Sequence, residues 1–151
     1  MKINTRDFGL VAVESNDIYD FPLGVYGFED DTQFALFNKV FDDIPFLYLQ
    51  SVLNTVPCFL VFEPGDFCPG YSPALSKEDL DSCGADNPNE LVFLVIANVS
   101  DSIEQIALNM KSPIVLNPKS KIGHQVILQN EDYLVRYQPF LSNGKGEAKC
   151  W

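Results

Sequence analysis

Only a few side chains of this sequence are of the types that carry out chemistry: one histidine, some pairs of adjacent acids and four cysteines. His124 is the sole candidate for a general base. A nucleophilic site would also need Ser or Cys beside it and an acid to orient it, and no G-x-S-x-G string is present. Since His124 follows Gly123 at the start of a predicted strand, an exposed histidine at a hairpin end is the simpler interpretation. The sequence favours a protein without enzymatic activity.

Adjacent acids occur at Asp30–Asp31, Asp42–Asp43 and Glu131–Asp132. A catalytic acid and base need pKa values that burial has pushed apart, whereas neighbouring acids in turns are usually both solvated. No segment matches the D-x-[DN]-x-[DN]-G pattern of a calcium-binding loop. The acid pairs therefore predict surface charge rather than catalysis or metal binding.

The cysteines do not have the spacing of a metal site. They stand at positions 58, 68, 83 and 150, never as C-x-x-C, and one histidine does not complete the usual mixed Cys/His zinc set. The longest apolar run, residues 91 to 97, is far shorter than the ~20 residues of a membrane helix, and the N-terminus lacks the apolar region of a signal peptide. We expect a cytoplasmic protein with no metal, no cofactor, no disulfide framework and no membrane contact.

The charge of the chain argues against nucleic acid as a direct partner. The net charge is −11; residues 1 to 104 carry 18 acids and 4 bases, whereas residues 105 to 151 carry 3 acids and 6 bases. Affinity for phosphates comes mainly from Lys and Arg, and Lys111, Lys119 and Lys121 form too small a patch, without flanking aromatic residues, to offset the acids. A protein or another cationic partner fits this charge better.

Short apolar segments separated by turn residues predict a mainly-β fold. The expected strands cover residues 10–15, 32–40, 45–52, 57–65, 91–97, 113–116, 124–128 and 133–138, with hairpin loops at 117–123 and 129–132. Two short helices are expected at 76–84 and 100–108; Ser76 caps the first of them and Gly84 ends it. The strand at 91–97 should be the most central one.

This number of short strands with little helix predicts a small antiparallel β-barrel-like single domain with one or two short helices. We place this domain at residues 1–141 and a flexible C-terminal tail at 142–151. The alternative function for such a fold is a small barrel that binds a hydrophobic ligand. That alternative needs small residues on inward positions, whereas the Phe, Leu, Ile and Tyr of these strands would fill the interior.

Several unusual strings occur in a fixed order along the chain. They are F-P-x-G-x-x-G-F-E at 21–29, L-Q-S at 49–51, E-P-G-D-F at 63–67, N-x-x-x-P-I-V-x-N at 109–117 and G-x-Q-V-I-L at 123–128. Together they resemble the family of the flagellar assembly factor FliW, from Thr5 to about Tyr137. The sequence departs from the family pattern at Tyr26, where proline is more frequent, and at Met110, where leucine is usual.

The resemblance implies a β-barrel-like fold and a non-enzymatic regulator. FliW proteins bind CsrA, a small dimeric RNA-binding repressor, and thereby relieve its block on flagellin translation. They also bind flagellin, so free flagellin recaptures the factor and repression returns. CsrA and flagellin are accordingly the expected partners. Because CsrA must present a basic surface to RNA, we expect the acidic chain to be steered to that surface and to repel the RNA.

Aromatic residues next to acids in loops are the expected partner contacts, since interface hot spots combine apolar anchors with a polar rim. The alternative is that most phenylalanines fill the barrel. Three amides in the family strings are expected as turn hydrogen-bonders that could also face a partner. The complete candidate set is Tyr26, Phe28, Glu29, Asp30, Asp31, Phe41, Asp42, Asp43, Asn109, Asn117 and Gln125.

Overall fold

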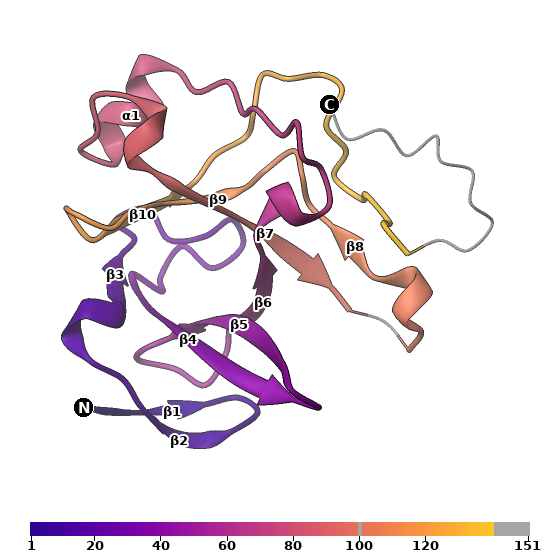
Figure 1. Ribbon diagram of the computed structural model, residues 1–151. Coiled ribbons are helices and arrows are strands. Elements are labelled where there is room, and N and C mark those ends of the chain that lie inside the picture. The colour runs from indigo at the N-terminus through magenta and orange to yellow at the C-terminus, as the bar shows by residue number, and fades with distance from the viewer. Residues whose placement is uncertain (100, 141–151) are drawn as a thin grey trace.

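The computed structural model describes residues 1–99 and 101–140, so the predicted tail at 142–151 lies outside the described residues (Figure 1). The strands of the described part are β1 (Lys2–Thr5), β2 (Gly9–Ala12), β3 (Ile18–Asp20), β4 (Gln33–Phe41), β5 (Ile44–Ser51), β6 (Cys58–Phe62), β7 (Val92–Asn98), β8 (Ala107–Leu108), β9 (Ile114–Asn117) and β10 (Ile122–Gln125). Its helices are α1 (Lys77–Ser82) and the 3-10 turns η1 (Ser15–Asp17), η2 (Pro64–Asp66), η3 (Pro88–Glu90) and η4 (Ile103–Gln105).

Eight strands form one sheet that closes on itself. The order is β6-β5-β4-β3-β10-β9-β7-β8, and a further pairing of β6 with β7 completes a barrel-like ring. Neighbouring strands are antiparallel except β3 and β10, which are parallel and meet at Asp20 and Ile122. The mainly-β prediction is confirmed, with one parallel pairing in an otherwise antiparallel sheet.

Alternating side chains of β4 face two different cores. Phe34 and Leu36 point into the ring, whereas Ala35 and Phe37 pack against Ile3 and its neighbours on the β1–β2 hairpin. Successive side chains of a strand point to opposite faces, and here both sets are packed against apolar residues, so this part of β4 is buried on both faces. The hairpin therefore covers the outer face of β4 while the ring encloses the inner one.

The interior of the ring is filled by large side chains. Those that are almost completely buried there are Phe21, Phe34, Leu49, Leu94, Ile114 and Leu116. Gly123 of β10 is needed at the same place, because a Cβ on it would lie 2.4 Å from the ring of Phe21. A hydrophobic ligand inside the ring would have to displace this core, which removes the support for the hydrophobic-ligand alternative.

A two-residue turn joins β4 to β5. Phe41 pairs with Ile44, and both Asp42 (φ 50°) and Asp43 (φ 65°) have left-handed backbone conformations. Two successive positive φ values are the requirement of a type I′ hairpin turn. The acid pair Asp42–Asp43, the second acidic loop, is therefore the exposed tip of the longest hairpin of the sheet.

The helix α1 agrees with the prediction for residues 76–84. The Ser76 hydroxyl accepts a hydrogen bond from the Asp79 N–H, and Gly84 follows the helix at φ +68°. The helix predicted at 100–108 is wrong: the described part has the 3-10 turn η4 and then strand β8. Leu108 is fully buried and exchanges two backbone hydrogen bonds with Tyr137, so tertiary pairing overrides local helix propensity.

The predicted meander at the C-terminal end is also different in the structure. The strand β10 begins at Ile122 rather than at His124 and ends at Gln125. The strand predicted at 133–138 is absent from the described chain; a single bridge between Tyr137 and Leu108 takes its place. Cys58 and Cys83 are free, whereas Cys68 is disulfide-bonded, a pairing that the expectation of no disulfide framework did not include.

Candidate functional site

The turn between β3 and β4 depends on glycine at one position above all. Gly24 has φ +67°, and a Cβ there would lie 2.5 Å from the Cα of Glu29 and 2.7 Å from the carbonyl oxygen of Phe28. The N–H of Gly24 donates to the Phe21 carbonyl at 2.8 Å, and the N–H of Phe28 donates to the Val25 carbonyl at 2.6 Å. The F-P-x-G-x-x-G-F-E string therefore encodes a backbone folded tightly onto itself.

Gln125 connects this turn to the last strands. Its Oε1 accepts from the Tyr26 N–H at 3.0 Å, and its Nε2 donates to the Ser112 carbonyl at 3.1 Å. The Gln125 side chain is buried, so its amide is a brace inside the fold. The Tyr26 side chain, whose backbone is held in this way, is 57% exposed.

The other two predicted amides are also internal hydrogen-bonders. Asn117 is buried; its Nδ2 donates to the Cys83 carbonyl at 2.8 Å and its Oδ1 accepts from the Lys119 N–H at 3.0 Å. Asn109 accepts from the Ser112 N–H at 3.0 Å. The prediction that these amides hold turns is confirmed. Asn117 and Gln125 are buried, whereas Asn109 is half-buried.

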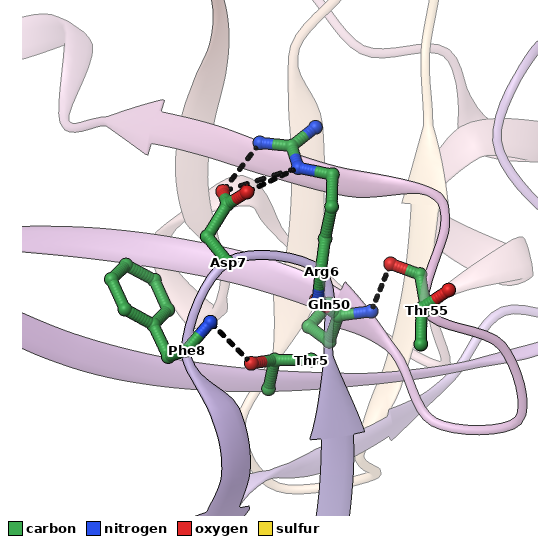
Figure 2. Close-up of polar contacts among 6 residues, drawn as sticks. All are labelled: Thr5, Arg6, Asp7, Phe8, Gln50 and Thr55. Carbon is green, nitrogen blue, oxygen red and sulfur yellow. Dashed lines mark hydrogen bonds and ion pairs between the residues drawn. The ribbon is translucent and has the colours of Figure 1, made fainter.

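Gln50 of the L-Q-S string is fully buried and joins separate segments of the chain (Figure 2). Its Oε1 accepts from the Arg6 N–H, at the tip of the β1–β2 hairpin, at 3.1 Å. Its Nε2 donates to the carbonyls of Asn54 and Thr55, each at 3.0 Å. One side chain thus positions both Arg6 and the loop that leads into β6.

The neighbouring Ser51 fixes one of the predicted acids. Its hydroxyl donates to Asp31 Oδ1 at 2.7 Å, and the Asn54 side-chain amide donates to the same oxygen at 2.9 Å. Asp31 is only 9% exposed. Its carboxylate is therefore part of the scaffold that holds the β3–β4 turn to the loop after β5.

A groove of about 550 Å³ opens between β6 and β7. The two strands pair only at Val61–Ile96 and Phe62–Val95. No pairing joins β6 and β7 beyond these two, while Ala97 and Asn98 at the end of β7 pair with β8 (Figure 1). The groove is lined by Arg6, Phe28, Val56, Pro57, Cys58, Phe59, Leu60, Ile96, Ala97, Asn98 and Val99.

The groove differs in charge from the rest of the chain. Among the residues that line it, Arg6 alone is charged. The Arg6 guanidinium makes a two-pronged pair with the adjacent Asp7, with Nη2 at 2.9 Å from Oδ2 and Nε at 3.1 Å from Oδ1; this hydrogen bonding raises the pKa of Arg6. Burial raises the pKa of the Cys58 thiol to about 11, so near neutral pH it is not a thiolate nucleophile.

The two predicted acidic loops do not form one site. The first ends at Asp31, just before β4, and the second begins at Asp42, just after it. A strand of nine residues spans about 30 Å, so the loops lie at opposite ends of the sheet. Phe28 of the first loop packs edge-on against Phe59 with ring centroids 5.6 Å apart, whereas Phe41 of the second lies 5.9 Å from Phe46.

His124 is half-buried beside α1. Burial lowers the pKa of its imidazole, and Asp79 opposes this shift more weakly. The hydroxyl in the hollow next to it belongs to Ser82, and it donates to the Glu78 carbonyl at 2.9 Å. A hydroxyl engaged with backbone is poorly placed as a nucleophile. In residues 1–99 and 101–140, no three His, Cys, Asp or Glu side chains gather as ligands for a metal ion.

Of the residues that line the groove, sequence reasoning had singled out Phe28 alone. Arg6, Val56 and Cys58 lie in segments that carry no catalytic or binding pattern, and Arg6 reaches the groove through a contact with Gln50 that spans 44 residues. The only sequence signal for the position of Arg6 was the L-Q-S string, because its glutamine, Gln50, makes that contact. Within the described chain no helix is long and apolar enough to cross a membrane.

Taken together, the closed ring, the covering hairpin and the open edge of β6 define a small mainly-β protein of barrel-like architecture. The family model described as "FliW protein" matches residues 2–139. A protein named "Flagellar assembly factor FliW" from Thermoanaerobacter pseudethanolicus is 35% identical over 137 residues, which cover 91% of each chain. The protein of that name from Syntrophomonas wolfei is 35% identical over 140 residues, which cover 93% of this chain and 89% of the relative.

The fold is similar as well. A crystal structure described as that of the flagellar assembly factor FliW superimposes with a TM-score of 0.82 at 31% identity, covering 93% of this chain and 97% of the other. The chain belongs to the FliW family. The resemblance inferred from its sequence strings is therefore confirmed.

Proposed function

We propose that this chain is a cytoplasmic flagellar assembly factor that binds CsrA and flagellin in turn. The match to the FliW family over residues 2–139 carries the proposal. Bound to the factor, CsrA no longer represses translation of flagellin mRNA; free flagellin then takes the factor back, and repression resumes. The chain acts by binding alone, without catalysis.

The exposed turn at residues 26–30 supports a basic protein as partner. Tyr26 is 57% exposed and Phe28 is 40% exposed, and the acids Glu29 and Asp30 follow directly. A hydrogen bond from the Gly27 N–H to Glu29 at 3.0 Å lowers the pKa of that carboxyl, which keeps it charged. Two aromatic anchors with an acidic rim, on a backbone that Gly24 and Gln125 hold rigid, have the composition of an interface hot spot.

The net charge of −11 supplies a mechanism for competition with RNA. A protein that holds RNA must present Lys and Arg to phosphates, so long-range attraction speeds its encounter with an acidic body. Once docked, the same acids repel RNA phosphates from neighbouring basic residues. The factor therefore lowers RNA affinity even where it does not cover the RNA site.

Binding of purified CsrA to paired charge variants tests this proposal. The variant Glu29→Gln/Asp30→Asn should bind CsrA about tenfold more weakly at low salt, because two rim charges are lost. The matched control is Asp42→Asn/Asp43→Asn, which removes the same charge at the far end of β4 in a turn whose positive φ values Asn tolerates. The control should bind like the wild-type chain.

Two further measurements complete the test. Affinity for CsrA should fall several-fold between 50 mM and 500 mM salt, because exposed charges are screened beyond a Debye length of ~10 Å at 0.1 M. Added flagellin should release CsrA from the complex. A salt-independent affinity would refute the electrostatic mechanism, and the absence of binding to either protein at micromolar concentration would refute the function itself.

A further inference from the structure

We propose that the groove between β6 and β7 binds an extended peptide segment of a partner protein, which adds as a strand to the free edge of β6 and places a carboxylate on Arg6. The inference rests on the proposed function only in taking the partner to be a protein. It assigns a surface and a mode of recognition that are separate from the acidic turn, although Phe28 stands at the rim of both.

The edge of β6 has backbone groups directed into the groove. Cys58, Phe59 and Leu60 pair with β5 on one side, whereas the pairing with β7 begins only at Val61. The Pro57 carbonyl accepts from the Ser51 N–H, so it faces β5. Because successive residues of an antiparallel strand direct their N–H and C=O groups to opposite sides, those of Cys58 face the groove. An unpaired strand edge of this kind is a template for another strand.

The dimensions suit a short extended segment. The free edge of three residues, Cys58 to Leu60, is about 10 Å long, so an added strand would pair over roughly three residues. A groove of about 550 Å³ accommodates their side chains between Phe59 on one wall and Ile96 on the other. Since these walls are mainly apolar, the segment should carry apolar side chains at alternate positions.

The charge of the groove selects an acidic segment. Although the chain contains 21 acids, none is among the residues that line the groove, and Arg6 is the only cation there. Gln50 holds the backbone of Arg6, and Asp7 holds its guanidinium on one side. Figure 2 shows the other terminal nitrogen of the guanidinium directed away from Asp7, where a second carboxylate can approach it. Charge complementarity thus favours a peptide carboxylate over a basic segment.

A synthetic peptide provides a direct test. The probe is an acetylated, C-terminally amidated heptapeptide of alternating valine and threonine that ends in glutamate, titrated into the full chain by NMR and calorimetry. We expect saturable binding, with the largest amide shifts at Cys58 and Leu60 and slower hydrogen exchange of the Cys58 N–H. Replacing the terminal glutamate by glutamine should weaken binding about fivefold, and N-methylation of the peptide amides should abolish it.

Two matched variants of the loop before β6 locate the site. Val56 is 56% exposed and lines the groove, whereas Leu53 is 72% exposed in the same loop and does not line it. Val56→Glu should weaken peptide binding at least tenfold by placing an acid near the peptide carboxylate, and Leu53→Glu should leave it unchanged. Equal thermal unfolding midpoints of the two variants show that the fold is intact.

Three results would overturn the inference: no binding of the probe to the wild-type chain at millimolar concentration, equal effects of the two glutamate variants, or equal binding of the N-methylated peptide. Self-association of the chain that Val56→Glu abolishes, without any binding of the probe, would assign the groove to a second copy and would also overturn it. None of these outcomes bears on the CsrA titration, so the two proposals fail independently.

Discussion

Replacing Gln50 by leucine should destabilise the whole domain although the two side chains have similar size. The change removes the acceptor of the Arg6 N–H and the two N–H donors that the carbonyls of Ser51, Asn54 and Thr55 share, in a part of the fold where Gln50 itself has no exposed surface. At about 1 kcal/mol for each lost hydrogen bond, the free energy of unfolding should fall by about 3 kcal/mol. For a domain of this size that corresponds to a decrease in Tm of roughly 6–12 °C.

Thermal unfolding followed by circular dichroism measures this effect. The control is Gln33→Leu on the adjacent strand, where the amide makes one exposed hydrogen bond to Asp20 at 3.1 Å and its loss should shift Tm by at most about 2 °C. If Gln50→Leu unfolds within 2 °C of the control variant, the buried amide does not hold these segments together and the reasoning is refuted. In Gln50→Leu, peptide binding in the groove should also weaken, because Arg6 and the loop at 52–57 both lose their hydrogen bonds to Gln50.

Other substitutions test separate parts of the structure. Gly24→Ala should lower the urea midpoint far more than Gly9→Ala: both glycines have φ near +65°, but an added methyl group meets backbone only at Gly24. Replacing Asp42-Asp43 by Asn-Gly should raise the free energy of unfolding by about 0.5–1 kcal/mol, since this pair suits the type I′ turn better; an unchanged midpoint would contradict the turn assignment. Burial lowers the pKa of His124 below 6.5, so the unfolded chain binds a proton more readily; stability should decline as the pH falls below 6.5, and His124→Gln should flatten that part of the profile.

Local patterns sufficed where an element contains its own signals. The alternation in 32–40 and the proline-led segment at 45–52 predicted β4 and β5 to within one residue at each end. Ser76 as a cap, with acids close behind it and Gly84 at the end, predicted α1, and the structure shows a capping box at Ser76 and a left-handed Gly84. The filled interior was also expected from the large apolar residues on the strands. For β4, β5 and α1 the deciding signals lie within the segment itself.

Patterns failed where a distant partner decides the conformation. The segment 103–108 has helical propensity, but burial of Leu108 and its hydrogen bonds with Tyr137 make it a turn and a strand. The β1 strand was not expected at all, because a segment of four residues carries no signal of its pairing with β2 or of its packing on β4. The candidate acids show the same limit. Asp30 and Asp31 are adjacent, yet only Asp31 accepts hydrogen bonds from Ser51 and Asn54.

The groove was beyond sequence reasoning for a related reason. It exists because β6 and β7 pair along only part of their length, and the extent of this pairing depends on residues far apart in the sequence. Arg6 is held beside the groove by one hydrogen bond, from its backbone N–H to the buried side-chain amide of Gln50. The family strings contain residues that hold the fold together, such as Gln50. The groove between β6 and β7 lies between segments that only the folded chain brings together.

The seam between β3 and β10 bears on how the chain folds during synthesis. It consists of one pairing, Asp20 with Ile122, supported by the Asp20 N–H donating to the Lys121 carbonyl at 2.8 Å. The meander from β3 to β6 is complete once Phe62 has left the ribosome, but both of its outer strands must wait for partners from β7 and β10. The nascent chain therefore carries two open sheet edges over much of its translation, the state in which strands pair wrongly with other chains. The free stretch at Cys58 to Leu60 is the remnant of one of those edges in the finished molecule.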